Sequence, residues 1–190
     1  MKGYMEPLFK TRPNYKSIYF DLPGMGKTKG KAWITGTDDY LKIIIEFVEK
    51  IIPNESFIIV GESYGCYLVR GLIKKKQNLI DGVLFLVPAI LPYEEQRDLP
   101  EPIILVKDEN LVSKLSPFER EIFEDVATII NKKVVERGKE EGLPGLTIAD
   151  MVFLEKVREN YEFSFNVDLL NDKFIKPTLF LLGRQDSAVG

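Results

Sequence analysis

One pentapeptide in this sequence has the residue types and the spacing of a covalent catalyst. Residues Gly61-Glu62-Ser63-Tyr64-Gly65 fit the pattern G-x-S-x-G, in which a serine lies on a sharp turn from a strand to a helix. The turn directs the serine hydroxyl off the end of the sheet, and the next backbone N–H faces the place where an oxyanion would form. Small residues are expected on both sides, because neighbouring chain packs against the turn. The pattern predicts Ser63 as a nucleophile and the Tyr64 N–H as an oxyanion donor.

The segments on either side of the serine have the character that this turn requires. Phe57–Val60 is a short apolar run, typical of a strand buried on both faces. Tyr64–Lys76 has apolar residues at helical spacing and three lysines at its C-terminal end. The letters alone leave an alternative open, namely an ordinary glycine-rich turn with a capping serine.

The sequence contains no histidine, which is the commonest general base and a common metal ligand. Any hypothesis that makes Ser63 a nucleophile must therefore find its base elsewhere. The single cysteine, Cys66, excludes an internal disulfide and a thiolate metal cluster. We expect Cys66 to be a small buried side chain and not a nucleophile, because no base is at hand. No metal and no organic cofactor are implied.

The composition is that of an ordinary globular domain. The 190 residues are 45% hydrophobic and 29% charged, with a net charge of −3 and with basic and acidic residues mixed along the chain. This balance argues against a nucleic-acid partner or an anionic membrane partner. The first ten residues lack the apolar stretch of a secretory signal, and no apolar run is long enough to span a bilayer. We expect a cytoplasmic protein, and its oligomeric state cannot be read from the sequence.

Strand and helix signals alternate through the first half of the chain. The pattern predicts a strand at Tyr15–Phe20, a helix from Thr37 to Ile52 with Thr37 as N-cap, a strand at Phe57–Val60, a helix at Tyr64–Lys76, and a strand at Val83–Val87 that ends at Pro88. This order is typical of an α/β fold, in which a mostly parallel sheet has helices on both faces.

The alternation of strand and helix signals ends after this region. Residues 91–172 are charged and mostly helical, with helical segments at Pro117–Asn131 and Ile148–Asn160, a break at Gly142–Gly145, and a short strand or helix start at Ile103–Val106. The run Pro177–Gly183 then resembles a buried strand. We therefore predict a core at 1–90, an inserted helical cap or lid at 91–172, and a return to the core at 173–190. The aromatic residues of the cap either line an apolar pocket or hold its helices together.

Three motifs in order resemble the α/β-hydrolase family. Asp21–Thr28 resembles the family's D-x-P-G-x-G-x-S/T turn, Gly61–Gly65 resembles its nucleophile elbow, and Gly183–Asp186 resembles the G-x-x-D turn that presents the catalytic acid. The order of serine before acid also matches the family. The resemblance implies a partial α/β-hydrolase fold with Ser63 and Asp186 as catalytic residues. Residues 184–187 also fit a plain polar turn.

The differences between this sequence and the family pattern are as informative as the similarities. No histidine follows Asp186, and no His-Gly segment precedes Asp21 to supply a second oxyanion donor. The family strand that separates the strands predicted at Tyr15–Phe20 and Phe57–Val60 has no counterpart, so we expect open apolar edges there, which are prone to aggregation. From these departures we expect a chain truncated at both ends: a truncated reading frame, a fragment or one partner of a split protein.

Two function classes remain open at this stage. The first is a serine hydrolase that acts on an ester, amide, thioester or related carbonyl with an apolar acyl or aromatic group, and that has negligible activity in this histidine-free form. The second is a non-catalytic α/β-hydrolase-like binding or scaffold protein. Gly24-Met25-Gly26-Lys27-Thr28 imitates the end of a phosphate-binding P-loop, but Asp21 stands where that motif needs glycine, and no helix follows directly.

Overall fold

The computed structural model describes residues 1–189, and the chain forms two compact units. One unit combines Met1–Lys31 with Ile104–Leu154, and the other combines Ala32–Ile103 with the chain from Glu155 onward. Both candidate catalytic side chains, Ser63 and Asp186, belong to the second unit. Each unit therefore has two stretches that are distant in sequence.

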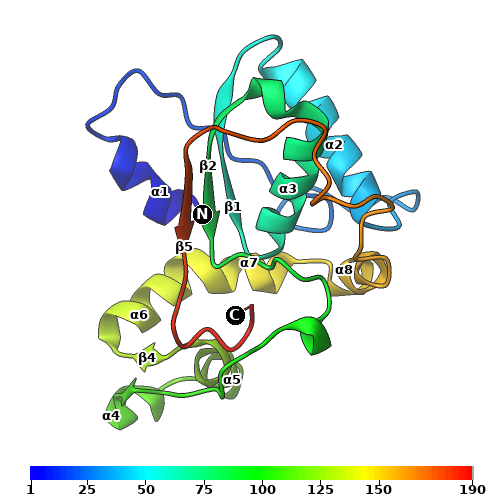
Figure 1. Ribbon diagram of the computed structural model, residues 1–190. Coiled ribbons are helices and arrows are strands. Elements are labelled where there is room, and N and C mark those ends of the chain that lie inside the picture. The colour runs from blue at the N-terminus through cyan, green and yellow to red at the C-terminus, as the bar shows by residue number, and fades with distance from the viewer. Residues whose placement is uncertain (190) are drawn as a thin grey trace. The chain divides into compact units, whose positions relative to one another are not determined.

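The second unit contains a parallel three-stranded sheet. Its strands are β1 (Phe57–Glu62), β2 (Ile80–Leu86) and β5 (Thr178–Leu181), in the order β1-β2-β5 (Figure 1). Both pairs are parallel, and Glu62, Leu86 and Leu181 lie level with one another at the carboxyl ends of the three strands. The parallel sheet predicted from the alternation of strand and helix signals is confirmed.

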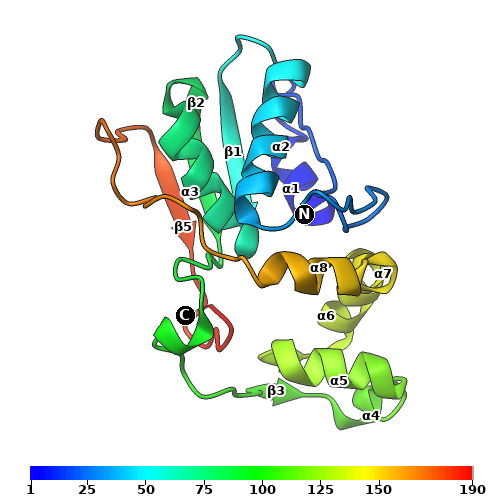
Figure 2. The ribbon, with the colours of Figure 1, turned by 90° about the vertical axis from the view of Figure 1, so that its right-hand side faces the viewer.

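Two helices of this unit form its core with the sheet. Helix α3 (Tyr64–Lys76) packs against β1 and β2, and α2 (Thr37–Ile51) packs against α3 (Figure 2). Short 3₁₀ turns η1 (Gln77–Leu79) and η2 (Glu94–Gln96) flank β2. The apolar side chains spaced three and four apart on the helices meet those of the strands, and the buried set includes Leu41, Ile44, Val48, Leu68, Leu72, Ile80, Val83 and Phe85.

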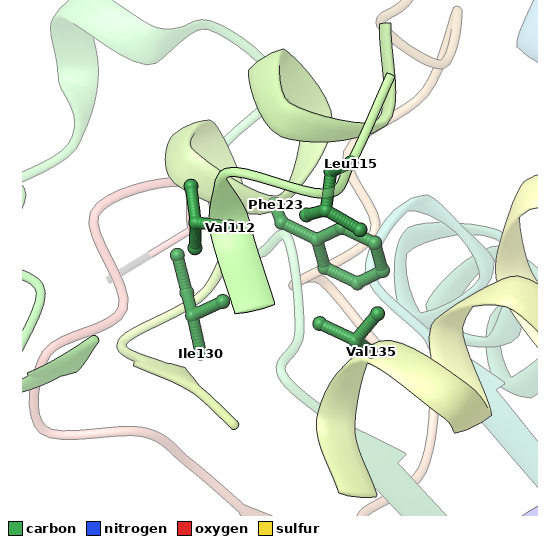
Figure 3. Close-up of a cluster of buried hydrophobic side chains, with 5 residues drawn as sticks. All are labelled: Val112, Leu115, Phe123, Ile130 and Val135. Atoms are coloured by element: carbon green, nitrogen blue, oxygen red, sulfur yellow. The ribbon is translucent and has the colours of Figure 1, made fainter. Parts of the chain in front are cut away.

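The first unit is mostly helical. Its elements are α1 (Lys2–Phe9), β3 (Val106–Lys107), α4 (Glu109–Val112), α5 (Pro117–Val126), β4 (Ile129–Ile130), α6 (Lys132–Arg137), the π-helical turn η3 (Gly138–Gly142) and α7 (Leu143–Ile148), and α8 (Met151–Arg158) begins in it. Figure 3 shows its small core, formed by Val112, Leu115, Phe123, Ile130 and Val135. A capping box between Ser116 and Glu119 starts α5.

Several expectations about local structure are wrong. The helix expected over Pro117–Asn131 ends at Val126, and Ile129–Ile130 form β4. The strand expected to be buried within Pro177–Gly183 is exposed at all four residues of β5. Tyr15–Phe20 forms no strand, because no described strand pairs with it and a β-propensity run without a ladder partner stays irregular. The break expected at Gly142–Gly145 is helical, since Pro144 lies in the first turn of α7, where its missing N–H costs nothing. Thr37 is the first residue of α2, and the N-cap is Gly36. The limits proposed for the core and the cap stay a prediction.

Candidate functional site

Ser63 lies at the junction that the pentapeptide predicted. It follows β1 directly and precedes α3, with φ 47° and ψ −119°. A non-glycine residue rarely adopts a positive φ, and the cost is of order 1–3 kcal/mol. The Ser63 N–H donates to the carbonyl of Leu86 at 3.0 Å, which ties the turn to the end of β2. The strained conformation is thus held by the sheet itself.

The two glycines of the pentapeptide differ in what surrounds them. A Cβ on Gly61 would lie 2.8 Å from the backbone N and Cα of Cys66 and from the backbone C of Gly65, so only glycine fits there. A Cβ on Gly65 would meet nothing within 4 Å in the part of the chain that the structure describes. The expectation that both positions must be small is confirmed for Gly61 and is wrong for Gly65.

The Ser63 carbonyl determines where the next N–H points. It accepts hydrogen bonds from the N–H of Cys66 at 2.9 Å and from the N–H of Ala89 at 3.2 Å. Because the peptide is planar and trans, the Tyr64 N–H is directed to the opposite side. No backbone acceptor for this N–H is recorded among residues 1–189, as is usual in the first turn of a helix. The Tyr64 N–H is therefore available to a ligand oxygen.

Asp186 lies in a turn at the same edge of the sheet as Ser63. Its N–H donates to Gly183 O at 3.3 Å, and its Oδ1 accepts the N–H groups of Ala188 and Val189, both at 3.0 Å. Ser63 follows β1, and the turn follows β5, with β2 between them. The strands that lead to the two side chains are therefore two strand spacings, about 10 Å, apart in the sheet.

The Tyr64 side chain is anchored by a directional pair of hydrogen bonds. Thr37 Oγ1 lies 2.6 Å from Tyr161 O and 2.8 Å from the Tyr64 hydroxyl. A carbonyl can only accept, so Thr37 gives its one proton to Tyr161, and the Tyr64 hydroxyl donates to Thr37. Burial raises the pKa of Tyr64 well above its ordinary value, so the phenol stays protonated and remains a donor. The sequence pattern predicts Thr37 only as a helix cap and gives no signal for this role.

The loop after β2 is a second feature that the sequence did not reveal. Val87 has φ 39°, an outlier for a β-branched residue. Arg97 donates from three nitrogens to the carbonyls of Leu91 at 3.0 Å, Pro92 at 3.0 Å and Ala188 at 2.7 Å. It therefore joins this loop to the turn that carries Asp186. An open hollow of about 470 Å³ lies beside Arg97 and is lined mainly by Pro88, Ile90, Leu91, Phe180, Leu182 and Val189.

The third family-like motif lies in the first unit. Gly24 and Gly26 have φ 82° and 55°, and Asp21 Oδ2 accepts the N–H of Lys27 at 3.0 Å. A Cβ on Gly26 would overlap the Asp21 carboxylate, so this carboxylate fills the concave side of the loop. In a P-loop that space receives phosphate. The structure thus gives a physical reason against the nucleotide-binding alternative.

The remaining candidate groups are structural in character. The Cys66 thiol is buried and donates to Leu86 O at 3.4 Å, and its burial raises its pKa to about 11. It is therefore protonated at neutral pH, which weakens it as a nucleophile. Within residues 1–189 no three metal-ligating side chains of the Cys, Asp and Glu types gather at one point. No described helix combines the length and the apolar character needed to cross a bilayer.

Comparison with known proteins gives the family. The sequence pattern of the alpha/beta hydrolase fold matches residues 4–128. An alpha/beta superfamily hydrolase from Oenococcus oeni PSU-1 is 28% identical, with a TM-score of 0.81 over 90% of this chain and 64% of that one. This chain therefore spans less than two thirds of the length of that hydrolase.

Other solved structures are more distant. A monoacylglycerol lipase from Paleococcus ferrophilus is 17% identical, with a TM-score of 0.43 over 86% of this chain and 60% of that one. NosK from Streptomyces actuosus is 18% identical, with a TM-score of 0.47 over 98% and 71%. No curated protein sequence matches the chain. The family match covers more than half of the chain, which therefore belongs to the alpha/beta hydrolase fold family.

Proposed function

We propose that this chain provides the nucleophile and the acid of a serine hydrolase that acts on an ester, amide, thioester or related carbonyl. The observation that carries the proposal is the left-handed backbone of Ser63 at the β1–α3 junction. The Asp186 turn at the same edge of the sheet supports it. A strained serine at the carboxyl end of a parallel strand is the arrangement that a nucleophile elbow requires.

The proposed chemistry follows the usual course of serine hydrolysis. Ser63 Oγ attacks the carbonyl carbon while its proton passes to a base, and the oxyanion forms opposite the Tyr64 N–H. Collapse of the tetrahedral intermediate expels the leaving group, which takes the proton from the base. Water then releases the acyl group by the same steps in reverse. Asp186 would orient the base, as the acid does in a Ser-His-Asp triad.

The base is the part that these 190 residues do not contain, since they include no histidine. We therefore propose that the base comes from outside these residues. The open hollow beside Arg97 is mainly apolar, which supports a substrate with an apolar acyl or aromatic group. For the chain by itself we propose negligible turnover, because an unassisted serine hydroxyl is a weak nucleophile.

The test is hydrolysis of p-nitrophenyl butyrate with and without added imidazole as an external base. Without imidazole, we expect the wild-type chain and Ser63→Ala to give the same rate. With imidazole, the wild type should show an excess rate that Ser63→Ala lacks and that the control Ser113→Ala keeps, because Ser113 is an exposed serine of the other unit. Turnover that depends on Ser63 without imidazole would refute the proposed inactivity.

The alternative function is a non-catalytic binding or scaffold protein, and the absence of histidine from the sequence favours it. A fluorophosphonate probe with imidazole present separates the two functions, since only an activated serine is labelled. Labelling that disappears in Ser63→Ala supports the hydrolase. An unlabelled wild type that also shows no excess esterase rate at any imidazole concentration supports the binding protein.

A further inference from the structure

We propose that Val87 and Ala89 form a positioning turn that aims the Tyr64 N–H at the reacting oxygen. The proposal deepens the proposed function and rests on it, because it takes Ser63 as the nucleophile. It concerns the backbone of residues 86–89, where the sequence pattern predicts only the end of a strand.

The turn begins where β2 ends, directly opposite Ser63. Glu62 and Leu86 are level in the sheet, so Ser63 and Val87 are the first residues beyond it on neighbouring strands. The Val87 N–H still donates to Leu181 O at 2.9 Å, which keeps this residue in register with β5. Its positive φ then redirects the chain, and two residues later the Ala89 N–H reaches the Ser63 carbonyl at 3.2 Å.

This hydrogen bond differs in kind from the other one that the Ser63 carbonyl accepts. The Cys66 N–H belongs to α3, the helix that Tyr64 begins, so it moves with that helix. The Ala89 N–H follows a different strand and fixes the Ser63–Tyr64 peptide relative to the sheet. Since the N–H of a trans peptide points away from its carbonyl, fixing the Ser63 carbonyl also fixes the direction of the Tyr64 N–H.

The surroundings hold the turn in place. A left-handed conformation at a β-branched residue persists only where neighbouring structure determines it. Here Ala89 is 2% exposed, and the next carbonyls are bound by arginines: Arg70 donates to Ile90 O at 2.5 Å, and Arg97 donates to Leu91 O. The turn is thus secured on both sides, at Leu181 before it and at the arginines after it.

The test measures the electrostatic environment of position 63 without needing a catalytic base. In a Ser63→Cys variant, the thiol pKa is obtained from the rate of iodoacetamide alkylation against pH. The helix N-terminus and the Tyr64 N–H should lower this pKa below the ordinary value of about 8.5. Cys66 contributes little background because it is buried.

The perturbation is an amide-to-ester change at position 89, made by incorporating lactic acid, which removes the N–H alone. We expect the thiol pKa to rise by about half a unit, which is roughly a threefold smaller thiolate fraction at pH 7. The matched control is an amide-to-ester change at Val83, which lies on β2, the strand that leads to Ala89. The Val83 N–H donates to Pro177 O at 2.9 Å. That control should leave the thiol pKa unchanged.

The outcomes separate this proposal from the function on which it rests. A thiol pKa of about 8.5 in Ser63→Cys would contradict the proposed oxyanion environment itself. A lowered pKa that the ester at position 89 does not raise, or that the ester at Val83 raises equally, overturns only the positioning role. If the ester variant does not fold, NMR coupling across the hydrogen bond from Ala89 N to the Ser63 carbonyl carbon decides, and its absence in the wild type overturns the proposal.

Discussion

Replacing Gly61 by alanine introduces one methyl group into the backbone of the elbow. Its Cβ would lie 2.8 Å from three backbone atoms of Cys66 and Gly65, and backbone atoms cannot turn aside as the end of a side chain can. Either α3 must move away from β1 or the turn must open. Forced overpacking of this kind typically costs about 1–3 kcal/mol. For a protein of this size that corresponds to a melting temperature lower by roughly 2–12 °C.

Gly65→Ala is the matched control, since it adds the same methyl group within the same pentapeptide. A Cβ there meets nothing within 4 Å among the described residues, and alanine favours the helix over glycine by up to about 1 kcal/mol. The two variants should therefore differ in free energy of unfolding by about 1–4 kcal/mol.

The assay is urea unfolding followed by circular dichroism at 222 nm, with equal m-values required before free energies are compared. We expect Gly61→Ala to unfold at a lower urea concentration than the wild type, and Gly65→Ala at the same or a higher one. If Gly61→Ala is as stable as the wild type, or if Gly65→Ala is the less stable variant, the described packing between α3 and the end of β1 is wrong.

Two further predictions concern buried polar groups near the elbow. Thr37→Val keeps the shape of the side chain but leaves the Tyr64 hydroxyl and the Tyr161 carbonyl without their partner, so the free energy of unfolding should fall by about 1–3 kcal/mol. Tyr64→Phe leaves the Thr37–Tyr161 hydrogen bond intact, so its loss of stability in the same urea titration should be smaller. A loss equal to or larger than that of Thr37→Val would contradict the assigned direction of the proton. Burial raises the pKa of Cys66 to about 11, so the folded state keeps a proton that the unfolded thiol loses near pH 8.5. The free energy of unfolding should therefore decline as pH rises from about 9 to 11. Cys66→Ala should reduce that decline.

The sequence predicted the elements best where the local pattern and the tertiary fold agree. The helix predicted at Tyr64–Lys76 matches α3 at both ends, because the elbow fixes its start and a run of lysines ends its apolar face. The strand predicted at Phe57–Val60 is two residues too short, since Gly61 and Glu62 have no strand propensity and enter β1 through pairing with β2. Tyr15–Phe20 has the propensity without the pairing, and there the prediction failed.

Only part of the candidate site could be predicted from the sequence, for a similar reason. Motif spacing pointed to Ser63, Tyr64 and Asp186, and these positions stay a prediction for catalysis. The turn at Val87 and Ala89 could not be found in this way, because valine is among the residues least expected at a positive φ. Its conformation comes from hydrogen bonds to Leu181 and Ser63, which are distant in sequence.

Strand β5 ends the sheet with all four of its residues exposed. Among residues 1–189, no strand other than β2 pairs with it. Its sequence from Thr178 to Leu181 has no charged residue or proline that would hinder the pairing of a further strand. Leu179, Phe180 and Leu181 are each about half exposed. An extended peptide of another molecule could pair with the backbone of β5 and pack against its apolar side chains. We therefore expect the purified chain to associate more readily as its concentration rises.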